Sequence, residues 1–476
     1  MIQVHHPASW LPERGYVLRT LLDGWVGEEL DLVAEQRADT CIERLGGAGH
    51  VVIADGLFAG PEPDAAGAEP ASAPPPLAWR VGEPDLRRTV TADVLPLLHP
   101  TDGDRPVHVV DREVTMRFDL LGTAFTLLTA RDEAVDPSTD RHGRFPLESS
   151  LAWQAGVHER PLVDEYRSLL LWALRRAGVA DPPPRRPGTL RLTHDVDRPV
   201  AANEGGVGAL VRRTGADVLL RRDPALAGSR LATYPRARRG DVIRDPSYAF
   251  EFLMDVAEGA GRTATFNLLA RGRDEEGAVP PSRYDASYRL TDPFMDALIR
   301  RIVERGHAIG LHGSYNTIDS GEQLALEVEA LRAAMERAGH DLPAVSGRQH
   351  YLRWRPETWC HLAAAGVSAD SSVGFAEGPG FRSGTCHPFP VFDLTTRSTL
   401  PLTEHPLLIM DATLDPVALR RGAFEQIASR IGATVDACRT MRGELVILWH
   451  NTSVVGRRAR GLYRELVEHV GGTARA

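Results

Sequence analysis

Six short apolar runs in the second half of the chain end in side chains that can bind a metal or transfer a proton. The run "LRLTHDVDRPV" (residues 190–200) places Asp195 and Asp197 one residue apart. The other runs end at His312, at Arg348 with His350, at Asp370, at Asp411 and at His450. In a strand, residues two apart point to the same face, so we expect Asp195 and Asp197 on one face and His194 on the other.

This set of side chains suits hydrolysis assisted by a divalent metal. Carboxylate and imidazole ligands favour an ion such as zinc with one open position, which lowers the pKa of bound water to about 7. A second aspartate can accept the proton of the water, and a histidine opposite it can protonate a departing amine. An arginine beside the basic aspartate keeps that aspartate ionised. The residue types therefore predict hydrolysis of an amide or an ester.

Each residue taken alone also has an ordinary structural explanation. A single histidine at a strand end is more often a packed side chain than a ligand, Asp197 could begin a turn, and Asp370 could cap a loop. Arg348 could serve a structural ion pair, and Trp354 is more typical of core packing than of a sugar-binding surface. The convergence of six strand ends favours a site over these separate explanations.

The segments that carry these residues predict parallel β/α units closing toward a barrel. Strands are expected at residues 189–194, 263–270, 308–312, 344–349, 366–372, 407–413 and 444–450. Helical spacing of apolar residues lies between them, with Gly306 and Gly339 just past two of the helix ends. In such folds the active site lies at the carboxyl ends of the strands.

The first part of the chain predicts a smaller α/β domain, residues 1–180. Strands are expected at 50–56 and 106–114, and amphipathic helices at 31–47 and 162–178. The Pro- and Ala-rich residues 59–79 are expected to be a disordered insertion. The run "DPPPRRPG" (residues 181–188) predicts a stiff linker that separates this domain from residues 189–476.

Composition excludes several classes of function. The 476 residues carry a net charge of -9 and no lysine, which excludes Schiff-base and phosphate-loop lysine chemistry. No basic stripe with interleaved aromatic residues is visible, which argues against a nucleic-acid partner. The N-terminus shows no signal peptide, and no apolar run is long enough to span a bilayer, so we expect a cytoplasmic location.

From Leu190 to about Ser453 the chain resembles the polysaccharide deacetylase superfamily, metal-dependent carbohydrate esterases that remove N-acetyl groups from sugars. The resemblance rests on four segments in the family's order: "LTHDVD", "ERGHAIGLHGSYN", "GRQHYLRWRPETW" and "LVILWHN". It implies a distorted (β/α)7 barrel and a divalent metal, with zinc favoured over cobalt or nickel. "FDLLGTAFTLLTARDEA" and "RPLVDEY" resemble the accessory domain that often precedes such deacetylases in bacteria.

Carried over residue by residue, the resemblance implies Asp195 as the catalytic base and His450 as the general acid. Arg348 then steadies the base, while Asp197 and His312 bind the metal. The family's second metal histidine would fall four residues after His312, where this chain has Asn316. The amide oxygen of Asn316 can bind weakly, His350 can replace the missing ligand, or the metal site is lost. We expect a retained but altered site.

Three functions remain open at this stage. The first is a deacetylase acting on a small or oligomeric N-acetylated sugar, with a pocket that includes Tyr315, Asp370, Asp411 and Trp354. Residues 387–396 are expected to be a loop beside that pocket. The second function is a non-sugar amidohydrolase on the same barrel. The third is a degenerate barrel that binds a glycan or a protein without catalysis.

Overall fold

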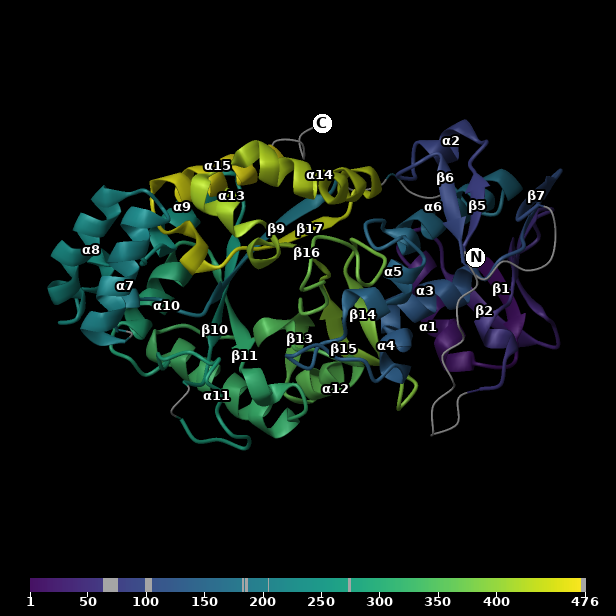
Figure 1. Cartoon of the computed structure of the whole chain (residues 1–476). Helices are drawn as coiled ribbons and strands as arrows, with labels where there is room; N and C mark the ends of the chain where they lie inside the picture. Colours follow the sequence, from purple (N-terminus) through teal and green to yellow (C-terminus); the bar gives the residue numbers. More distant parts are fainter. Residues whose placement is uncertain are drawn as a thin grey trace.

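The computed structural model describes residues 1–62, 76–98, 105–181, 184, 187–203, 205–272 and 275–471. Two α/β parts, each built on its own sheet, lie side by side along the long axis of the molecule (Figure 1). The later part of the chain forms the larger one, and the predicted α/β class is confirmed.

The larger part is built on one curled sheet of nine strands, in the order β14-β15-β13-β12-β11-β10-β9-β17-β16 (Figure 1). The strands are β9 (Thr189–Val196), β10 (Ala264–Leu269), β11 (Ala308–Gly313), β12 (Val345–Gln349), β13 (Val367–Asp370), β14 (Phe389–Asp393), β15 (Ser398–Glu404), β16 (Leu407–Met410) and β17 (Glu444–Leu448). Neighbouring strands pair in parallel, except that β14 is antiparallel to β15. The carboxyl ends of the parallel strands therefore share one edge of the sheet.

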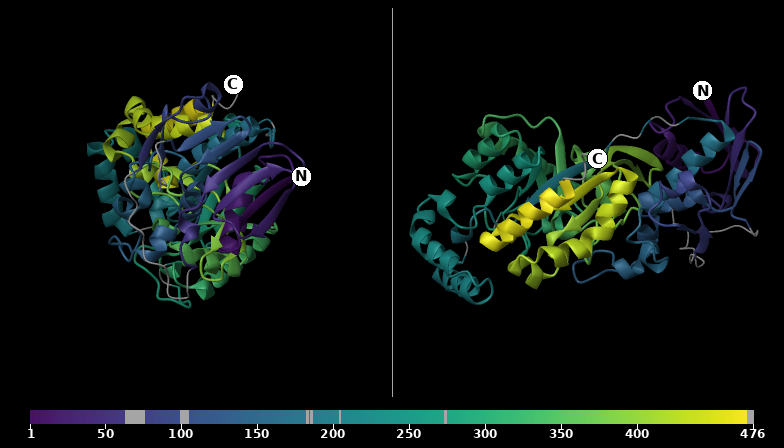
Figure 2. Two further views of the ribbon diagram at one scale, coloured as in Figure 1. Left: turned by 90° about the vertical axis from the view of Figure 1, so that its right-hand side faces the viewer. Right: turned by 90° about the horizontal axis from the view of Figure 1, so that it is seen from above.

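Helices connect these strands. They are α9 (Phe250–Gly259), α10 (Met295–Glu304), α11 (Gly321–Arg337), α12 (Pro356–Ala364), α13 (Pro416–Arg421), α14 (Phe424–Met441) and α15 (Arg457–Gly471). In α10 the buried side chains Met295, Leu298, Ile299 and Ile302 recur at helical spacing and form its core-facing stripe. Two further helices, α7 (Gly206–Leu219) and α8 (Pro224–Ala237), pack on each other at the end of the molecule far from the N-terminal part (Figures 1 and 2).

The seven strands predicted for this part are all present, but β14 and β15 were not predicted. Residues 387–396 were expected to be a loop beside the pocket, and that expectation is wrong. Most of the segment forms β14, and Phe389 and Phe392 are buried. The Phe392 ring packs 4.9 Å from the ring of Tyr16 in the N-terminal part. The nine-stranded order does not confirm the predicted count of seven units.

The smaller part has a six-stranded mixed sheet, in the order β2-β1-β3-β4-β8-β7, and a separate β5-β6 pair. Its strands are β1 (Ile2–Pro7), β2 (Leu30–Glu35), β3 (Asp39–Arg44), β4 (His50–Ala54), β5 (Leu77–Arg80), β6 (Val94–Leu97), β7 (Val107–Val110) and β8 (Glu113–Met116). Its helices are α1 (Leu11–Leu22), α2 (Pro84–Arg87), α3 (Leu120–Thr129), α4 (Arg131–Val135), α5 (Leu151–Gln154) and α6 (Leu162–Ala177). The predicted helix at 162–178 is confirmed as α6.

Two predictions for this part need correction. Residues 31–47 were expected to form a helix but form most of β2 and all of β3. The physical reason is β1, which lies between them and pairs parallel with β2 and antiparallel with β3. Of the predicted disordered insertion, residues 63–75 lie outside the described residues, whereas its last residues, 77–79, belong to β5.

The two parts share buried contacts. The Tyr16 hydroxyl donates to the Pro390 carbonyl oxygen (2.8 Å), and Arg382 donates to Glu133 through Nε (2.8 Å). One continuous apolar core contains side chains from both sheets. Of the predicted linker, residues 182–183 and 185–186 lie outside the described residues. The division into domains at 181–188 therefore stays a prediction.

Candidate metal centre and active site

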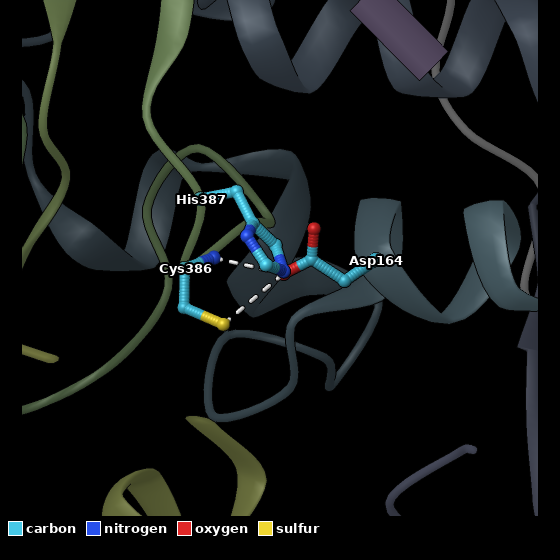
Figure 3. A group of neighbouring side chains, drawn as sticks. All are labelled: Asp164, Cys386 and His387. Carbon is cyan, nitrogen blue, oxygen red and sulfur yellow. Dashed lines mark hydrogen bonds between the residues drawn. The ribbon is translucent and has the colours of Figure 1, made fainter. Parts of the chain in front are cut away.

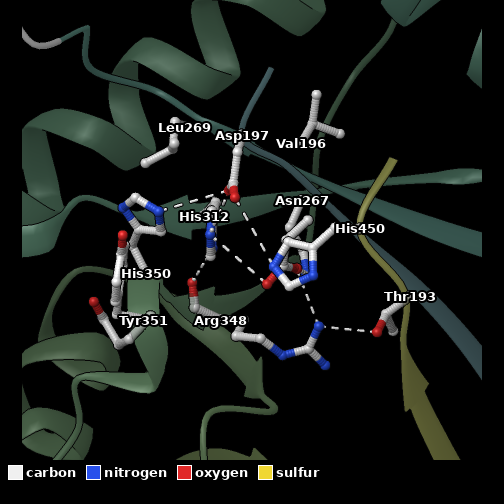
Figure 4. A network of polar contacts seen from close by, with 12 residues as sticks. Thr193, Val196, Asp197, Asn267, Leu269, His312, Arg348, His350, Tyr351 and His450 are labelled. Carbon is white, nitrogen blue, oxygen red and sulfur yellow. Dashed lines mark hydrogen bonds and ion pairs between the residues drawn. The ribbon is translucent and has the colours of Figure 1, made fainter. Parts of the chain in front are cut away.

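The carboxyl ends of β9, β11 and β12 bring Asp197, His312 and His350 together (Figure 4). Asp197 follows the last residue of β9, His312 lies in β11, and His350 begins the turn after β12. Oδ1 of Asp197 lies 3.5 Å from Nε2 of His312 and 3.6 Å from Nε2 of His350. One potential ligand atom from each residue lies within 4.8 Å of the other two.

The atoms of this group fit a divalent cation. Nδ1 of His312 donates to the Arg348 carbonyl oxygen (2.9 Å), so Nε2 is the ring nitrogen that faces Asp197. Nε2 of His312 and Oδ1 of Asp197 are both buried, and neither has a hydrogen-bond partner among the described residues. Two imidazoles and one carboxylate are a common ligand set for zinc with an open fourth position.

The turn after β12 fixes the position of His350. Tyr351 and Leu352, the next two residues, both have positive φ angles, 62° and 53°. Consecutive side chains larger than glycine rarely adopt this conformation, and such turns gather at functional sites. We call Asp197, His312 and His350 the metal group. His350 lies beside the other two residues of this group, while Arg348, two residues earlier, reaches the interior of the sheet.

Asp285 supports His350 from the other side. Nδ1 of His350 lies 3.6 Å from Oδ1 of Asp285, and the same oxygen accepts a hydrogen bond from the Tyr315 amide (2.7 Å). Oδ2 of Asp285 accepts from the Ser282 amide (2.9 Å). Burial opposes ionisation of Asp285, but the nearby His350 and the hydrogen bonds from these two amides lower its pKa below the usual range. An ionised carboxylate therefore lies against the far nitrogen of His350.

The side chain of Asn316 is occupied elsewhere. Its Nδ2 donates to the Pro280 carbonyl oxygen (2.8 Å), and its Oδ1 lies 3.5 Å from Nη1 of Arg353. Of the two replacement ligands that the sequence left open, the geometry favours His350.

Asp195, the predicted base, lies beside the metal group and is buried. Its Oδ1 accepts hydrogen bonds from Nδ2 of Asn267 (2.8 Å) and from Nη1 of Arg348 (3.1 Å). Its Oδ2 lies 3.7 Å from Nε2 of His312. Burial would raise the pKa of Asp195, but the charges of His312 and Arg348 outweigh it and hold that pKa below its usual value. Asp195 is therefore ionised at neutral pH.

Arg348 is fixed on every side. Its Nε and Nη2 donate to the carbonyl oxygen and hydroxyl of Ser371 (2.8 and 2.7 Å), and its Nη1 also donates to the Thr193 hydroxyl (2.9 Å). These bonds aim the guanidinium at Asp195 from a strand three places away in the sheet.

His450 lies across the group from His350 and is paired with Asp411. Its Nδ1 lies 2.6 Å from Oδ1 of Asp411, and its Nε2 lies 3.9 Å from Oδ2 of Asp197. Burial would lower the pKa of His450, but the carboxylate of Asp411 raises it to about 10. His450 therefore carries a proton at neutral pH and can act as an acid.

Two residues predicted for the substrate pocket are interior instead. Trp354 is 1% exposed and packs against Trp359 at 4.5 Å between ring centroids. Asp370 is buried, accepts from the Ser372 hydroxyl (2.8 Å), and pairs in register with Glu404 of β15. His194 points away from the metal group, as expected, and its Nδ1 lies 2.7 Å from the Trp449 carbonyl oxygen.

The rim beside His350 is aromatic. The Tyr315 ring lies 4.6 Å from that of Tyr284 and 5.5 Å from that of Tyr351, which is 38% exposed. His142, from the N-terminal part, joins this rim, with Nδ1 2.9 Å from the Tyr315 hydroxyl. Tyr315 was predicted for the pocket, whereas Tyr284 and His142 were missed because each lies in an aperiodic loop.

Asn267 and Asp285 were also missed. Asn267 carried a usable signal, because it is an amide side chain flanked by Phe266 and Leu268 in an apolar strand. Asp285 carried none, since the loop that holds it has no regular period.

A second group of potential ligands, Asp164, Cys386 and His387, lies between the two parts (Figure 3). Asp164 already accepts hydrogen bonds from the Cys386 amide (2.8 Å) and the Thr385 hydroxyl (2.6 Å), and it pairs with Arg167 (3.2 Å). These bonds satisfy both carboxylate oxygens, so the group serves to join the parts.

Comparison with known proteins gives a partial picture. A sequence model of a family of unknown function, DUF7033, matches residues 76–178. No curated protein matches the chain. Within the described residues, we find no helix with the length and apolar character that crossing a membrane requires.

Three of the solved structures that resemble this chain cover about three fifths of it. A protein named as a polysaccharide deacetylase from Mycobacterium smegmatis is 18% identical, with a TM-score of 0.37, covering 61% of this chain and 85% of its own. The PuuE allantoinase is 13% identical, with a TM-score of 0.35, covering 60% and 84%. A protein named as a polysaccharide deacetylase from Pseudomonas aeruginosa PAO1 is 14% identical, with a TM-score of 0.34, covering 59% and 84%.

Proposed function

We propose that this protein is a metal-dependent hydrolase that removes the acetyl group from an N-acetylated sugar or sugar conjugate. The observation that carries the proposal is the convergence of Asp197, His312 and His350 beside the ionised Asp195 and the protonated His450. A site that has base, acid and metal ligands within a few ångströms has the parts that amide hydrolysis needs.

Asp197, His312 and His350 would hold the metal, with zinc the best fit and cobalt or nickel as alternatives. When bound, the metal polarises the amide carbonyl and acidifies water. Asp285 and the Arg348 carbonyl oxygen orient the two imidazoles by contacting the nitrogens that do not face the metal group.

Asp195 and His450 supply the two proton transfers. Asp195 accepts one proton from the attacking water, and the oxygen of that water forms a bond to the acetyl carbon. His450 donates its proton to the amide nitrogen as the carbon–nitrogen bond breaks, so acetate and a free amine leave. Arg348 and Asn267 hold Asp195 in place, and Asp411 keeps His450 charged.

The aromatic rim supports a sugar substrate. Tyr351 presents an exposed ring next to His350, with Tyr315 and Tyr284 behind it. Aromatic rings combine an apolar face with a polar edge, which suits contact with sugar rings. The sequence motifs that resemble polysaccharide deacetylases support the same substrate class.

The proposal is tested by acetate release from UDP-N-acetylglucosamine and from chitooligosaccharides, with the metal-loaded wild type beside Asp195→Asn. We expect release by the wild type and a rate at least about 100-fold lower for the variant. Asp319→Asn, which changes an exposed carboxylate three residues after Asn316, is the matched control. Ring-opening of a cyclic ureide without acetate release would replace the deacetylase by the amidohydrolase. Sugar binding without turnover by metal-loaded protein would contradict catalysis.

A further inference from the structure

The α7–α8 hairpin exposes an unusual number of large apolar side chains. Seven of the sixteen exposed large hydrophobic side chains among the described residues lie in residues 205–244, with exposed fractions from 45% to 75%. They are Val207, Val211, Val218, Leu219, Leu220, Leu231 and Ile243. Val207, Val211 and Val218 lie on one face of α7, because their spacing of four and seven residues matches the helical repeat.

The same segment is strongly basic in an acidic chain. Residues 205–244 contain nine arginines and three aspartates, a net charge of +6, whereas the whole chain carries -9. Solvent-exposed aliphatic side chains and cations together are the composition of helices that lie in a membrane interface. We call residues 205–244 the basic hairpin.

The three aspartates of the basic hairpin are occupied within it. Asp217 is buried between Arg221 and Arg230, Asp241 pairs with Arg244, and Asp223 caps α8 at the Leu226 amide. Five exposed arginines have no carboxylate partner among the described residues: Arg212, Arg222, Arg236, Arg238 and Arg239. The outer surface of the hairpin is therefore positively charged and apolar at once.

We propose that the basic hairpin docks on an anionic membrane surface, with its aliphatic side chains in the headgroup region and its arginines on lipid phosphates. Charge decides between occupants. A second copy that docks through the same hairpin would bring two surfaces of like charge together. An anionic leaflet attracts each arginine, and the favourable binding free energies of the arginines add up. The headgroup region also accommodates the valines and leucines.

The position of the basic hairpin fits this role. The hairpin is inserted between the carboxyl end of β9 and α9, so it leaves the sheet at the edge that carries Asp197. It projects from the end of the molecule opposite the N-terminal part (Figures 1 and 2). A membrane could contact α7 and α8 there without displacing either sheet.

Flotation of the full chain with vesicles tests the proposal. Vesicles of phosphatidylcholine with about a third phosphatidylglycerol are compared with pure phosphatidylcholine at low and high salt. We expect flotation with the anionic vesicles only, with a partition coefficient at least about tenfold lower at high salt. Equal flotation with both vesicle types, or with neither, would overturn the proposal.

Two variants locate the binding surface. Arg236→Glu/Arg238→Glu/Arg239→Glu removes charge, and Val211→Ser/Leu219→Ser/Leu220→Ser removes the apolar contribution. Both should lower the partition coefficient at least about tenfold while the thermal unfolding temperature stays unchanged. The matched control reverses three exposed arginines of the N-terminal part, Arg19, Arg88 and Arg112, and should float like the wild type. An equal loss of flotation in the control would contradict docking on lipid. So would a wild type that is dimeric in solution and becomes monomeric in the serine variant.

Discussion

At the scale of single residues, the site is explained by where imidazoles and carboxylates can reach. His350 comes from the end of β12 and meets Asp197 just before Tyr351 and Leu352 turn the chain with positive φ angles. Asn316, four residues after His312, binds the Pro280 carbonyl instead. The candidate third ligand therefore lies in the segment after β12 and not four residues after His312.

Asp285→Asn should weaken metal binding about 10- to 100-fold, because an amide orients the His350 ring less well than a carboxylate and makes it less basic. The measurement is zinc affinity by competition with a chromophoric chelator. Asp319→Asn, with a 64% exposed side chain, is the control and should bind zinc as the wild type does. An unchanged affinity in Asp285→Asn would show that Asp285 does not support a metal ligand.

Asp411→Asn should lower kcat for acetate release about 100-fold or more, since His450 loses the carboxylate that keeps it protonated and oriented. Metal content should stay at the wild-type level, because neither residue belongs to the metal group. Steady-state kinetics beside metal analysis of the same preparation separates the two effects. Wild-type kcat in this variant would contradict the role of His450 as the acid.

The sequence predicted much of this chemistry but not its supports. Asp195, Asp197, His312 and His450 lie at or just after the carboxyl ends of strands, so the rule that parallel strands end at one edge places them together. Asp285 lies in a loop, where no repeat relates sequence position to direction. Trp354 was misplaced because an indole near a site can equally well pack inside, and here it lies against Trp359.

At the scale of elements, regular periodicity predicted the central strands. Pairing with distant strands determined the structure of other segments. Strands β9 to β13 are apolar runs between clear breaks. Residues 31–47 have helical spacing, but β1 provides pairing on both of its edges and draws them into β2 and β3. Such non-local pairing overrides local propensity and is invisible in one sequence.

The β13–β15 pair predicts a stability that falls as pH rises. Burial raises the pKa values of both Asp370 and Glu404, and the charge of Asp370 raises the pKa of Glu404 further. The folded protein therefore holds a proton that the unfolded chain releases near the ordinary Glu pKa of about 4.3. This contribution is complete below that pH and is lost as pH rises through the folded pKa.

Glu404→Gln should reduce this pH dependence, because the amide needs no proton to be neutral. Urea unfolding at about pH 5 and about pH 8 gives the free energy of unfolding at each pH. We expect the difference between these two free energies to be smaller in the variant than in the wild type. The same pH dependence in the variant and the wild type would show that the pair does not share a proton.

At the scale of the whole molecule, the two parts depend on each other. Tyr16 and Phe125 pack their rings against Phe392 of β14, at 4.9 and 5.5 Å. His142 reaches the rim of the site from the N-terminal part. The sequence placed a linker at 181–188 but could not show this shared core, since contacts between distant segments leave no local pattern.

Residues 189–476 expressed alone should be poorly folded, because removal of the N-terminal part takes away Tyr16 and Phe125, whose rings pack on the buried Phe392. Large exposed apolar patches promote association. Size-exclusion chromatography and thermal unfolding beside the full chain measure the effect. A monodisperse fragment with the unfolding temperature of the full chain would contradict the shared core.

The central claim is that His350 completes the metal site, and metal content by mass spectrometry tests it most directly. Untagged wild type is compared with His312→Ala, His350→Ala and Asn316→Ala after equal exposure to zinc. We predict about one zinc per chain in the wild type and in Asn316→Ala, and its loss from both histidine variants. Metal retained in His350→Ala but lost from Asn316→Ala would contradict the account, and so would a wild type that binds none.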